Sequence, residues 1–255
     1  MKDNRLKRLL DGGEVAAGIW AALGSEVTVE VAGQLGYDWI LLDLEHGVSG
    51  PEQGLALLRA TGGHAMTSIV RVPSADDAGL FKRILDCGAE GVLVPMIRSA
   101  EEVHKVVRAC RYPPQGIRGI ASLRAHGYGV DFKDYLARAN DEVLVMVQIE
   151  TKEAVEAVDA ILDVPGLDAV LVGPADLSAA LGAPLDTTAA PFERAIERVL
   201  AACARTGKPA GIYCHSPQDA KRWVARGFGF VNVCNDMSLL VSGMRSALNA
   251  MRDPR

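Results

Sequence analysis

Residues 38–47, DWILLDLEHG, join an apolar run suited to a buried strand to three ionisable groups, Asp43, Glu45 and His46. Unpaired charge is costly to bury, so a chain that ends its most apolar segment in this way needs a reason for doing so. Short apolar or β-branched runs of this kind alternate with longer helical patterns almost to the C-terminus. We predict eight strands, at residues 16–23, 38–45, 67–72, 91–97, 143–150, 167–173, 208–214 and 228–234.

Helical patterns separate these strands, for example in EEVHKVVRACR and TKEAVEAVDAIL. Eight strand-then-helix units with buried strands favour an α/β fold, a single-domain (β/α)₈ TIM barrel over residues 1–255, above an open doubly wound sheet. No G-x-G-x-x-G follows the first strand, which removes the usual reason to prefer a dinucleotide-binding fold, although the open sheet stays an alternative. We also expect a short N-terminal helix and an insertion at about residues 112–132, which is rich in Pro and Gly.

The composition argues against several classes of protein. The net charge of −5 comes with no basic run, so nucleic acid is not an expected partner, and no window approaches the roughly 18 apolar residues of a membrane span. The five cysteines are odd in number and form no C-x-x-C pair, which disfavours a disulfide framework and a zinc site. The basic N-terminus lacks the apolar core of a secretory signal, so we expect a cytoplasmic protein.

Polar residues gather where the predicted strands end. Asp43, Glu45 and His46 end the second strand, Arg71 the third, Gln148 and Glu150 the fifth, and Gly173 to Asp176 the sixth. In a TIM barrel the active site lies at the carboxyl ends of the strands. The sequence therefore predicts one site at this end of the barrel.

Glu150 and Asp176 close neighbouring strands and are candidate metal ligands. Two carboxylates with room for water and a chelating substrate suit Mg²⁺ or Mn²⁺. The alternative is that each carboxylate only caps its following helix, since ETKEA and ADLSA both look like helix starts. Their joint occurrence beside His46 and Arg71 favours a metal site.

His46 and Arg71 each have two interpretations. A histidine at a strand end beside Asp43 and Glu45 is suited to proton transfer, although a lone histidine is more often structural. Arg71 is either a counter-ion to these acids or a partner for a substrate carboxylate or enolate, and both roles are compatible.

Such a set of groups can bind a 2-oxo acid and stabilise its enolate, which is the chemistry of a metal-dependent aldolase. The competing Schiff-base route needs a buried lysine near the carboxyl end of a strand. Lys208 begins a strand and Lys152 starts a helix, so neither is suited to that role.

Six motifs, DWILLDLEHG, VRVP, ILDCGAEGVLVPM, RYPPQGIRG, VQIET and VGPADLS, together resemble the HpcH/HpaI aldolase family of class II pyruvate aldolases. They run in order through about two-thirds of the chain. The resemblance implies a carbon–carbon lyase that reversibly cleaves a 4-hydroxy-2-oxo acid to pyruvate and an aldehyde, in the catabolism of aromatic or sugar acids. It also implies a homo-oligomer, with a hexamer as the expected size.

The same resemblance implies roles for individual residues. Glu150 and Asp176 would hold the divalent cation, Mg²⁺ or Mn²⁺ with Co²⁺ and Zn²⁺ as alternatives. Gln148, Asp176 and the backbone around Gly173 and Ala175 would bind pyruvate. His46 would be the acid/base and Arg71 the enolate stabiliser. An aspartate matching Asp86 would raise the basicity of the histidine, but Asp86 precedes the fourth strand, at the far end of its own barrel, so Asp43 is the local candidate.

Several features leave alternatives open. The same site would serve an oxaloacetate-type decarboxylase, and a non-catalytic binding or assembly subunit would keep the barrel. VCNDM at 233–237 and CHSP at 214–217 depart from the family pattern, which favours a change in the aldehyde partner or the assembly over a change in the metal and pyruvate half. His215 is either a second polar contact or an exposed loop residue. Arg118 and Arg124 either meet an acidic aldehyde or are solvated. The apolar face of the last helix, with Leu239, Leu240, Met244 and Leu248, packs either on its own barrel or on a partner.

Overall fold

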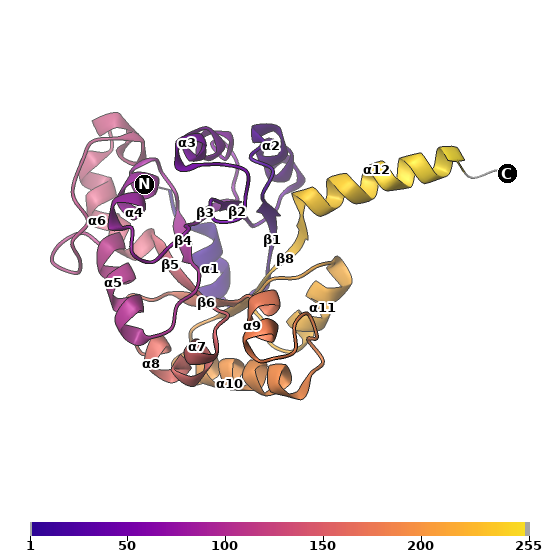
Figure 1. Cartoon of the computed structure of the whole chain (residues 1–255). Helices are drawn as coiled ribbons and strands as arrows, with labels where there is room; N and C mark the ends of the chain where they lie inside the picture. The colour runs from indigo at the N-terminus through magenta and orange to yellow at the C-terminus, as the bar shows by residue number, and fades with distance from the viewer. Residues whose placement is uncertain (1, 253–255) are drawn as a thin grey trace.

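The computed structural model describes residues 2–252 as a closed barrel of eight parallel strands in the order β1 to β8 (Figure 1). The predicted TIM barrel is therefore confirmed, and each predicted strand overlaps an observed one. The strands are β1 (Ala16–Ala21), β2 (Trp39–Asp43), β3 (Thr67–Arg71), β4 (Gly91–Val94), β5 (Leu144–Ile149), β6 (Ala169–Val172), β7 (Ala210–Ile212) and β8 (Phe230–Asn235).

Helices follow the strands and form the outer layer (Figure 1). They are α1 (Arg5–Asp11), α2 (Glu26–Leu35), α3 (Pro51–Ala60), α4 (Ala78–Asp86), α5 (Ala100–Cys110), α6 (Phe132–Glu142), α7 (Lys152–Glu156), α8 (Val158–Leu162), α9 (Pro174–Ala180), α10 (Ala190–Thr206), α11 (Pro217–Ala225) and α12 (Asp236–Arg252), with a 3₁₀ segment η1 (Arg124–Gly129). Most bury one apolar face against the strands, as their sequence periodicity predicts.

The barrel interior is filled by side chains at alternate strand positions. Trp39 and Leu41 of β2 and Phe230 of β8 belong to this inner cluster. Two glycines make room for the large rings, because a Cβ at Gly18 would lie 2.1 Å from Trp39 and one at Gly211 would lie 2.3 Å from Phe230. Close packing of these side chains makes the barrel interior rigid beneath the carboxyl ends of the strands.

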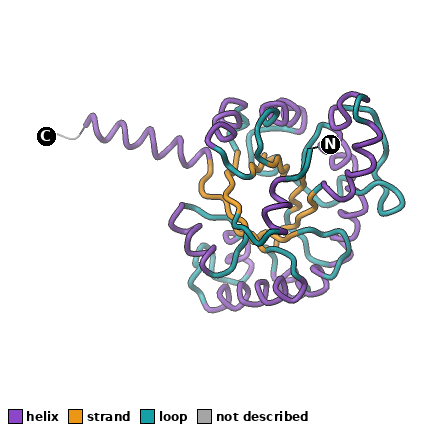
Figure 2. The backbone as a smooth tube through the Cα atoms, turned by 180° about the vertical axis from the view of Figure 1, so that it is seen from behind, coloured by secondary structure: helices purple, strands orange, loops and turns teal. Residues whose placement is uncertain are grey.

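The N-terminal helix α1 lies across the amino end of the barrel (Figure 2). Leu6 of α1 is fully buried in the inner cluster, and its N–H donates to Thr67 Oγ1 at 2.9 Å. This end of the barrel is thus closed by the chain itself, which leaves the carboxyl end open for a site.

Two sequence predictions need correction in detail. The second strand ends at Asp43, not at residue 45, because the Asp43 carboxylate accepts the N–H groups of Glu45 and His46 and turns the chain there. The predicted helix TKEAVEAVDAIL is divided between α7 and α8. Arg198 donates to the carbonyls of Val155 and Glu156 at this break.

The last helix does not pack on its own barrel. α12 projects away from the body (Figure 1), and among its described residues only Asp236 is buried. Leu239, Leu240, Met244 and Leu248 are all exposed, so the first of the two interpretations of this apolar face is wrong. Within residues 2–252 no helix is long and apolar enough to cross a bilayer.

Candidate active site

Strand alternation delivers the polar side chains to the mouth of the barrel. Asp43 follows the inward-facing Trp39 and Leu41, Arg71 follows Ile69, and Gln148 follows Met146 at the same two-residue interval. Asp43 and Arg71 also lie opposite each other in the register of β2 and β3. The period that builds the apolar core therefore places these polar groups directly above it.

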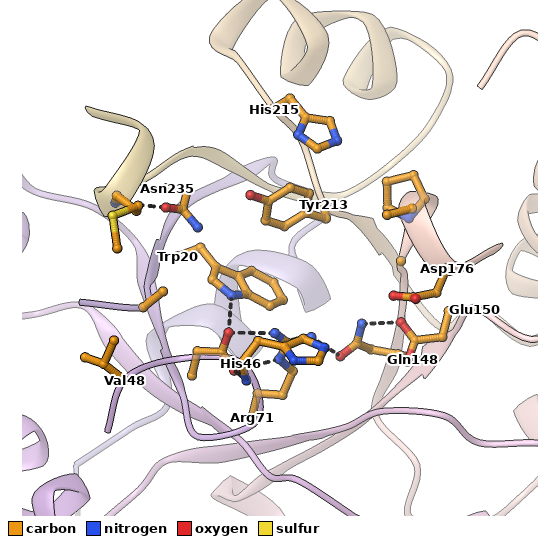
Figure 3. Close-up of a pocket in the computed structure, with 16 residues that line it drawn as sticks. Trp20, His46, Val48, Arg71, Gln148, Glu150, Asp176, Tyr213, His215 and Asn235 are labelled. Atoms are coloured by element: carbon orange, nitrogen blue, oxygen red, sulfur yellow. Dashed lines mark hydrogen bonds and ion pairs between the residues drawn. The ribbon is translucent and has the colours of Figure 1, made fainter. Parts of the chain in front are cut away.

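A cavity of about 370 Å³ opens at this end of the barrel (Figure 3). It is lined by most of the residues that the sequence nominated, namely Asp43, His46, Arg71, Gln148, Glu150, Gly173, Ala175 and Asp176. His215, nominated with less support, lines it as well. These residues come from the carboxyl ends of five strands, β2, β3, β5, β6 and β7, and the barrel brings them together.

Asp43 holds Arg71 in a two-point ion pair. Arg71 Nε and Nη2 lie 2.9 Å and 2.6 Å from the two carboxylate oxygens, and both residues are buried. Trp20 Nε1 donates to the same carboxylate at 3.1 Å, and Arg71 lies over the Trp20 ring at 4.8 Å. Burial raises the pKa of Asp43, but the hydrogen bonds and charge of Arg71 outweigh it, so the net pKa lies below the usual value.

Glu45 and His46 stand beside this pair. Glu45 forms a second ion pair with Arg71 Nη1 at 2.8 Å, and its other oxygen lies 3.9 Å from His46 Nε2. The His46 backbone N–H is fixed by Asp43 at 3.2 Å, while the imidazole is largely exposed at the mouth. In this chain Asp43 therefore contacts the backbone of His46, and Glu45 is the carboxylate that faces its ring.

Glu150 is buried on the opposite side of the cavity. One of its oxygens accepts the Met96 N–H at 2.8 Å and the other accepts Gln148 Nε2 at 2.7 Å. Met96 adopts a left-handed backbone with φ of +56°, which is uncommon for a residue with a side chain. The strained loop after β4 thus aims a backbone donor at the carboxylate.

The charge of Asp176 adds to that of Glu150. Burial raises the pKa of Glu150 to about 7, the Met96 N–H opposes this shift, and the charges of Asp176 and Glu45 increase it. Gly173 lies against the same carboxylate, since a Cβ there would be 2.2 Å from Glu150 Oε2. Only a residue without a side chain fits at Gly173, so the backbone there is exposed beside Glu150.

Several lining residues were not identified from the sequence. Trp20 lies near the end of β1 in a run that looks like ordinary core, yet its indole N–H donates to Asp43. Tyr213 and Asn235 also line the cavity, together with Val48 and Met237. The position of Trp20 at a strand end was a usable signal, because inward-facing residues there reach the site.

Asp86 lies outside the cavity. It is buried at the end of α4, where it accepts Arg118 Nη2 at 2.8 Å, and Arg118 lies over the Tyr112 ring at 4.4 Å. Arg118 is therefore neither solvated nor at the cavity, and Arg124 donates instead to the carbonyls of Cys87 and Leu58. Within this chain the structure does not bring Asp86 to His46.

The sequence is similar to that of known aldolases. Residues 16–243 match the family described as HpcH/HpaI aldolase/citrate lyase. A 4-hydroxy-2-oxo-heptane-1,7-dioate aldolase of Shigella flexneri is 40% identical over 239 residues, which cover 93% of this chain and 89% of that protein. A 5-keto-4-deoxy-D-glucarate aldolase of Shigella dysenteriae serotype 1 is 37% identical over 251 residues, with 98% and 96% covered.

Solved structures show the same likeness. The crystal structure of an HpcH/HpaI aldolase/citrate lyase family protein from Burkholderia cenocepacia J2315 superposes with a TM-score of 0.93 at 36% identity. The alignment covers 98% of this chain and 100% of that one. The likeness thus extends over the whole barrel.

Proposed function

Because the chain belongs to the HpcH/HpaI aldolase/citrate lyase family, we propose that the polar cluster at the barrel mouth is its active site. The chain is a class II pyruvate aldolase, a carbon–carbon lyase that cleaves 4-hydroxy-2-oxo acids. Its two named relatives connect it with the catabolism of aromatic and sugar acids. The observation that supports the site assignment is the convergence of Asp43, His46, Arg71, Glu150 and Asp176 on one cavity.

The aldolases of this family depend on a metal, and the residues at the mouth fit one. Glu150 and Asp176 are hard oxygen donors; burial is the main cause of the raised pKa of Glu150, and the charge of Asp176 adds to it. Mg²⁺ and Mn²⁺ accept one or two carboxylates and take their other ligands from substrate and water. Glu150 and Asp176 supply two carboxylates to the cavity, and within residues 2–252 no group of three or more His, Cys, Asp or Glu side chains is arranged to hold an ion.

We therefore assign Glu150 and Asp176 as the residues that would hold the divalent cation, with Mg²⁺ or Mn²⁺ preferred over Co²⁺ and Zn²⁺. A cation held there would polarise the keto oxygen of the substrate and offset the negative charge that develops on it. Gln148 and Glu150 are fixed by their mutual hydrogen bond, so the donor oxygens are set before a ligand arrives.

The pyruvate half of the substrate would lie beside Gln148, Asp176 and the bare backbone of Gly173 and Ala175. All four line the cavity, and the absence of a side chain at Gly173 leaves room for a small acid close to Glu150. Arg71 lies within 3.4 Å of Gln148 Oε1 and presents its guanidinium from the other side. Its charge would stabilise the oxyanion of the enolate.

Cleavage breaks the bond between C3 and C4 of the substrate. The proton of the 4-hydroxyl passes to a base, C4 becomes the aldehyde carbon, and the electron pair remains with C3 as the pyruvate enolate. We assign His46 as this base, because its imidazole stands at the mouth with the Glu45 carboxylate 3.9 Å from Nε2. Asp43 is a positioning residue that holds Arg71 and the His46 backbone.

Exchange of the pyruvate methyl protons tests this assignment without any aldehyde. Metal-stripped protein in D₂O should exchange them only after Mn²⁺ is added, as followed by proton NMR. Glu150→Gln should lose exchange by at least about a hundredfold, whereas Glu153→Gln, which changes an exposed carboxylate three residues away, should not. Undiminished exchange in excess chelator would reject the proposal.

We also propose that the chain forms a homo-oligomer in which α12 packs on a second copy. Val27, Val31 and Leu35 make an exposed apolar row on α2, which complements the exposed face of α12. Light scattering after size exclusion should show a multimer, with a hexamer expected. Met244→Glu should dissociate it, and Val130→Glu, at an exposed apolar residue outside both helices, should not; a monomeric wild type would contradict this proposal.

A further inference from the structure

The cavity has a second wall that the proposed function leaves unused. Tyr213 and Asn235 lie across the opening from Glu150 and Asp176, with His215 above Tyr213 (Figure 3). The two carboxylates, with Arg71 and His46, would bind and activate the pyruvate half. The wall of Tyr213, His215 and Asn235, which we call the distal wall, faces the space left for the aldehyde half.

Asn235 is held in one orientation. Its side-chain oxygen accepts the N–H of Met237 at 2.9 Å and that of Ser238 at 3.3 Å at the start of α12. Because N–H groups can only donate, the atom that faces them must be the oxygen. The amide nitrogen of Asn235 is therefore the atom turned to the cavity, where one of its two N–H groups bonds Tyr213 and the other can donate to a ligand.

Tyr213 presents a second donor. Burial raises the pKa of Tyr213, against the opposing effects of its hydrogen bond with Asn235 and the charge of Arg71, so the hydroxyl remains protonated at neutral pH. The ring is fixed by edge-on contacts with Trp20 and with His215, each at 5.1 Å between ring centroids. A donor held this firmly loses little conformational freedom when it binds.

The charges around the distal wall determine whether it can bind a carboxylate or a hydroxyl group of the aldehyde. Among the described residues that line the cavity, Arg71 is the only lysine or arginine, and it is already paired with Asp43 and Glu45. Asp43 adds a negative charge beside that arginine, and Glu150 and Asp176 are assigned to the divalent cation. His215 offers an imidazole, not a permanent cation. A carboxylate on the aldehyde would lack a free cation here, whereas a hydroxyl needs only a hydrogen-bond partner.

We propose that the distal wall binds a hydroxyl group of the aldehyde, and that the enzyme therefore prefers short, uncharged hydroxyaldehydes to semialdehydes that carry a carboxylate. This inference rests on the proposed function, since it assigns the aldehyde half of that same site. Tyr213 and Asn235 are the specificity-determining residues, and Val48, exposed at the rim of the cavity, is the point at which a cation can be added.

A matched pair of aldehydes tests the hydroxyl contact. Glycolaldehyde and propanal differ by a hydroxyl in place of a methyl group, and each is added to pyruvate by the Mn²⁺-loaded protein. The kcat/KM for glycolaldehyde divided by that for propanal should fall about tenfold in Tyr213→Phe, as expected for the loss of one hydrogen bond. The ratio should be unchanged in Tyr128→Phe, which alters an exposed tyrosine outside the cavity. Comparing ratios cancels the different reactivities of the two aldehydes.

A second arm tests the charge argument. Wild-type enzyme should have a higher kcat/KM for glycolaldehyde than for succinate semialdehyde, and Val48→Lys should raise the value for the semialdehyde about tenfold. An unchanged ratio in Tyr213→Phe, or a wild type that prefers the semialdehyde, would overturn the inference.

Deuterium exchange into pyruvate separates the two levels of failure. If wild-type protein exchanges the methyl protons but the aldehyde ratios do not move, only the distal wall is refuted. If no exchange occurs with Mn²⁺, the proposed function fails and this inference falls with it.

Discussion

Replacing Asp43 with Asn tests whether the buried ion pair positions Arg71. The carboxylate accepts hydrogen bonds from Trp20 and from two nitrogens of Arg71, as well as two backbone N–H groups. An amide has one oxygen, so in either orientation its NH₂ group faces at least two donors. Arg71 keeps Glu45 at 2.8 Å, which offsets part of the loss.

The magnitude follows from these contacts. Breaking a buried ion pair by removing one partner costs about 3–5 kcal/mol. With the remaining Glu45 pair we expect a decrease of about 3 kcal/mol in the free energy of unfolding at pH 7, measured by urea denaturation. A guanidinium displaced by about 1 Å costs about a hundredfold in rate, so kcat/KM for aldol cleavage should fall by at least that factor.

At acid pH the difference in free energy of unfolding between wild type and Asp43→Asn should become smaller. Asp43 has a lowered pKa in the folded state, so its contribution to stability is present above the unfolded pKa of about 3.9 and is lost as the pH falls through the folded value. Asp38→Asn is the matched control, because Asp38 directly precedes the same strand and pairs with the half-exposed Arg5 at the other end of the barrel. That change should cost no more than about 1 kcal/mol.

A loss below about 1 kcal/mol in Asp43→Asn, together with kcat/KM within about threefold of wild type, would refute the reasoning. It would mean that Glu45 alone positions Arg71. The function of Asp43 would then be limited to turning the chain after β2.

Two further predictions concern the other buried acids. Glu150 has a pKa raised to about 7, so in metal-free protein its contribution to stability falls as the pH rises from about 4.5 to 7. At pH 8 Glu150→Gln should therefore have a higher urea midpoint than wild type, with a free energy of unfolding larger by about 1–3 kcal/mol. The difference should be smaller at pH 5, and in Mn²⁺ wild type should be the more stable protein. An equal midpoint at both pH values would count against the raised pKa. Asp86→Asn should lower the free energy of unfolding by about 3–5 kcal/mol through loss of the Arg118 pair, and should leave the acid limb of the pH profile of kcat/KM in place. A shift of that limb by about one pH unit would instead support the action of Asp86 on His46 from a second copy.

The barrel could be predicted because the strand-then-helix pattern repeats eight times along the chain. Each strand carries its own apolar run, and Trp39, Leu41 and Asp43 follow one another at the two-residue interval that also places the polar groups at the mouth of the barrel. Reading the last polar residue of each run therefore located most of the cavity lining. The end of β2 was misplaced because a side chain, not an apolar pattern, stops the strand there.

The remaining errors concern partners that sequence spacing does not encode. Trp20 looks like core until its indole N–H is seen to donate to Asp43. Arg118 looks like a surface charge until the chain folds Tyr112 and Asp86 around it. The apolar face of α12 is visible in the sequence, but periodicity cannot say which molecule covers it.

We propose above all that Glu150 and Asp176 together hold one divalent cation. Calorimetric titration of metal-free protein with Mn²⁺ measures this directly. Wild type and Glu153→Gln should bind with the same affinity, and Glu150→Gln and Asp176→Asn should each bind at least about a hundredfold more weakly. Mn²⁺ affinity that is unchanged in both of these variants would exclude a metal site at these two carboxylates.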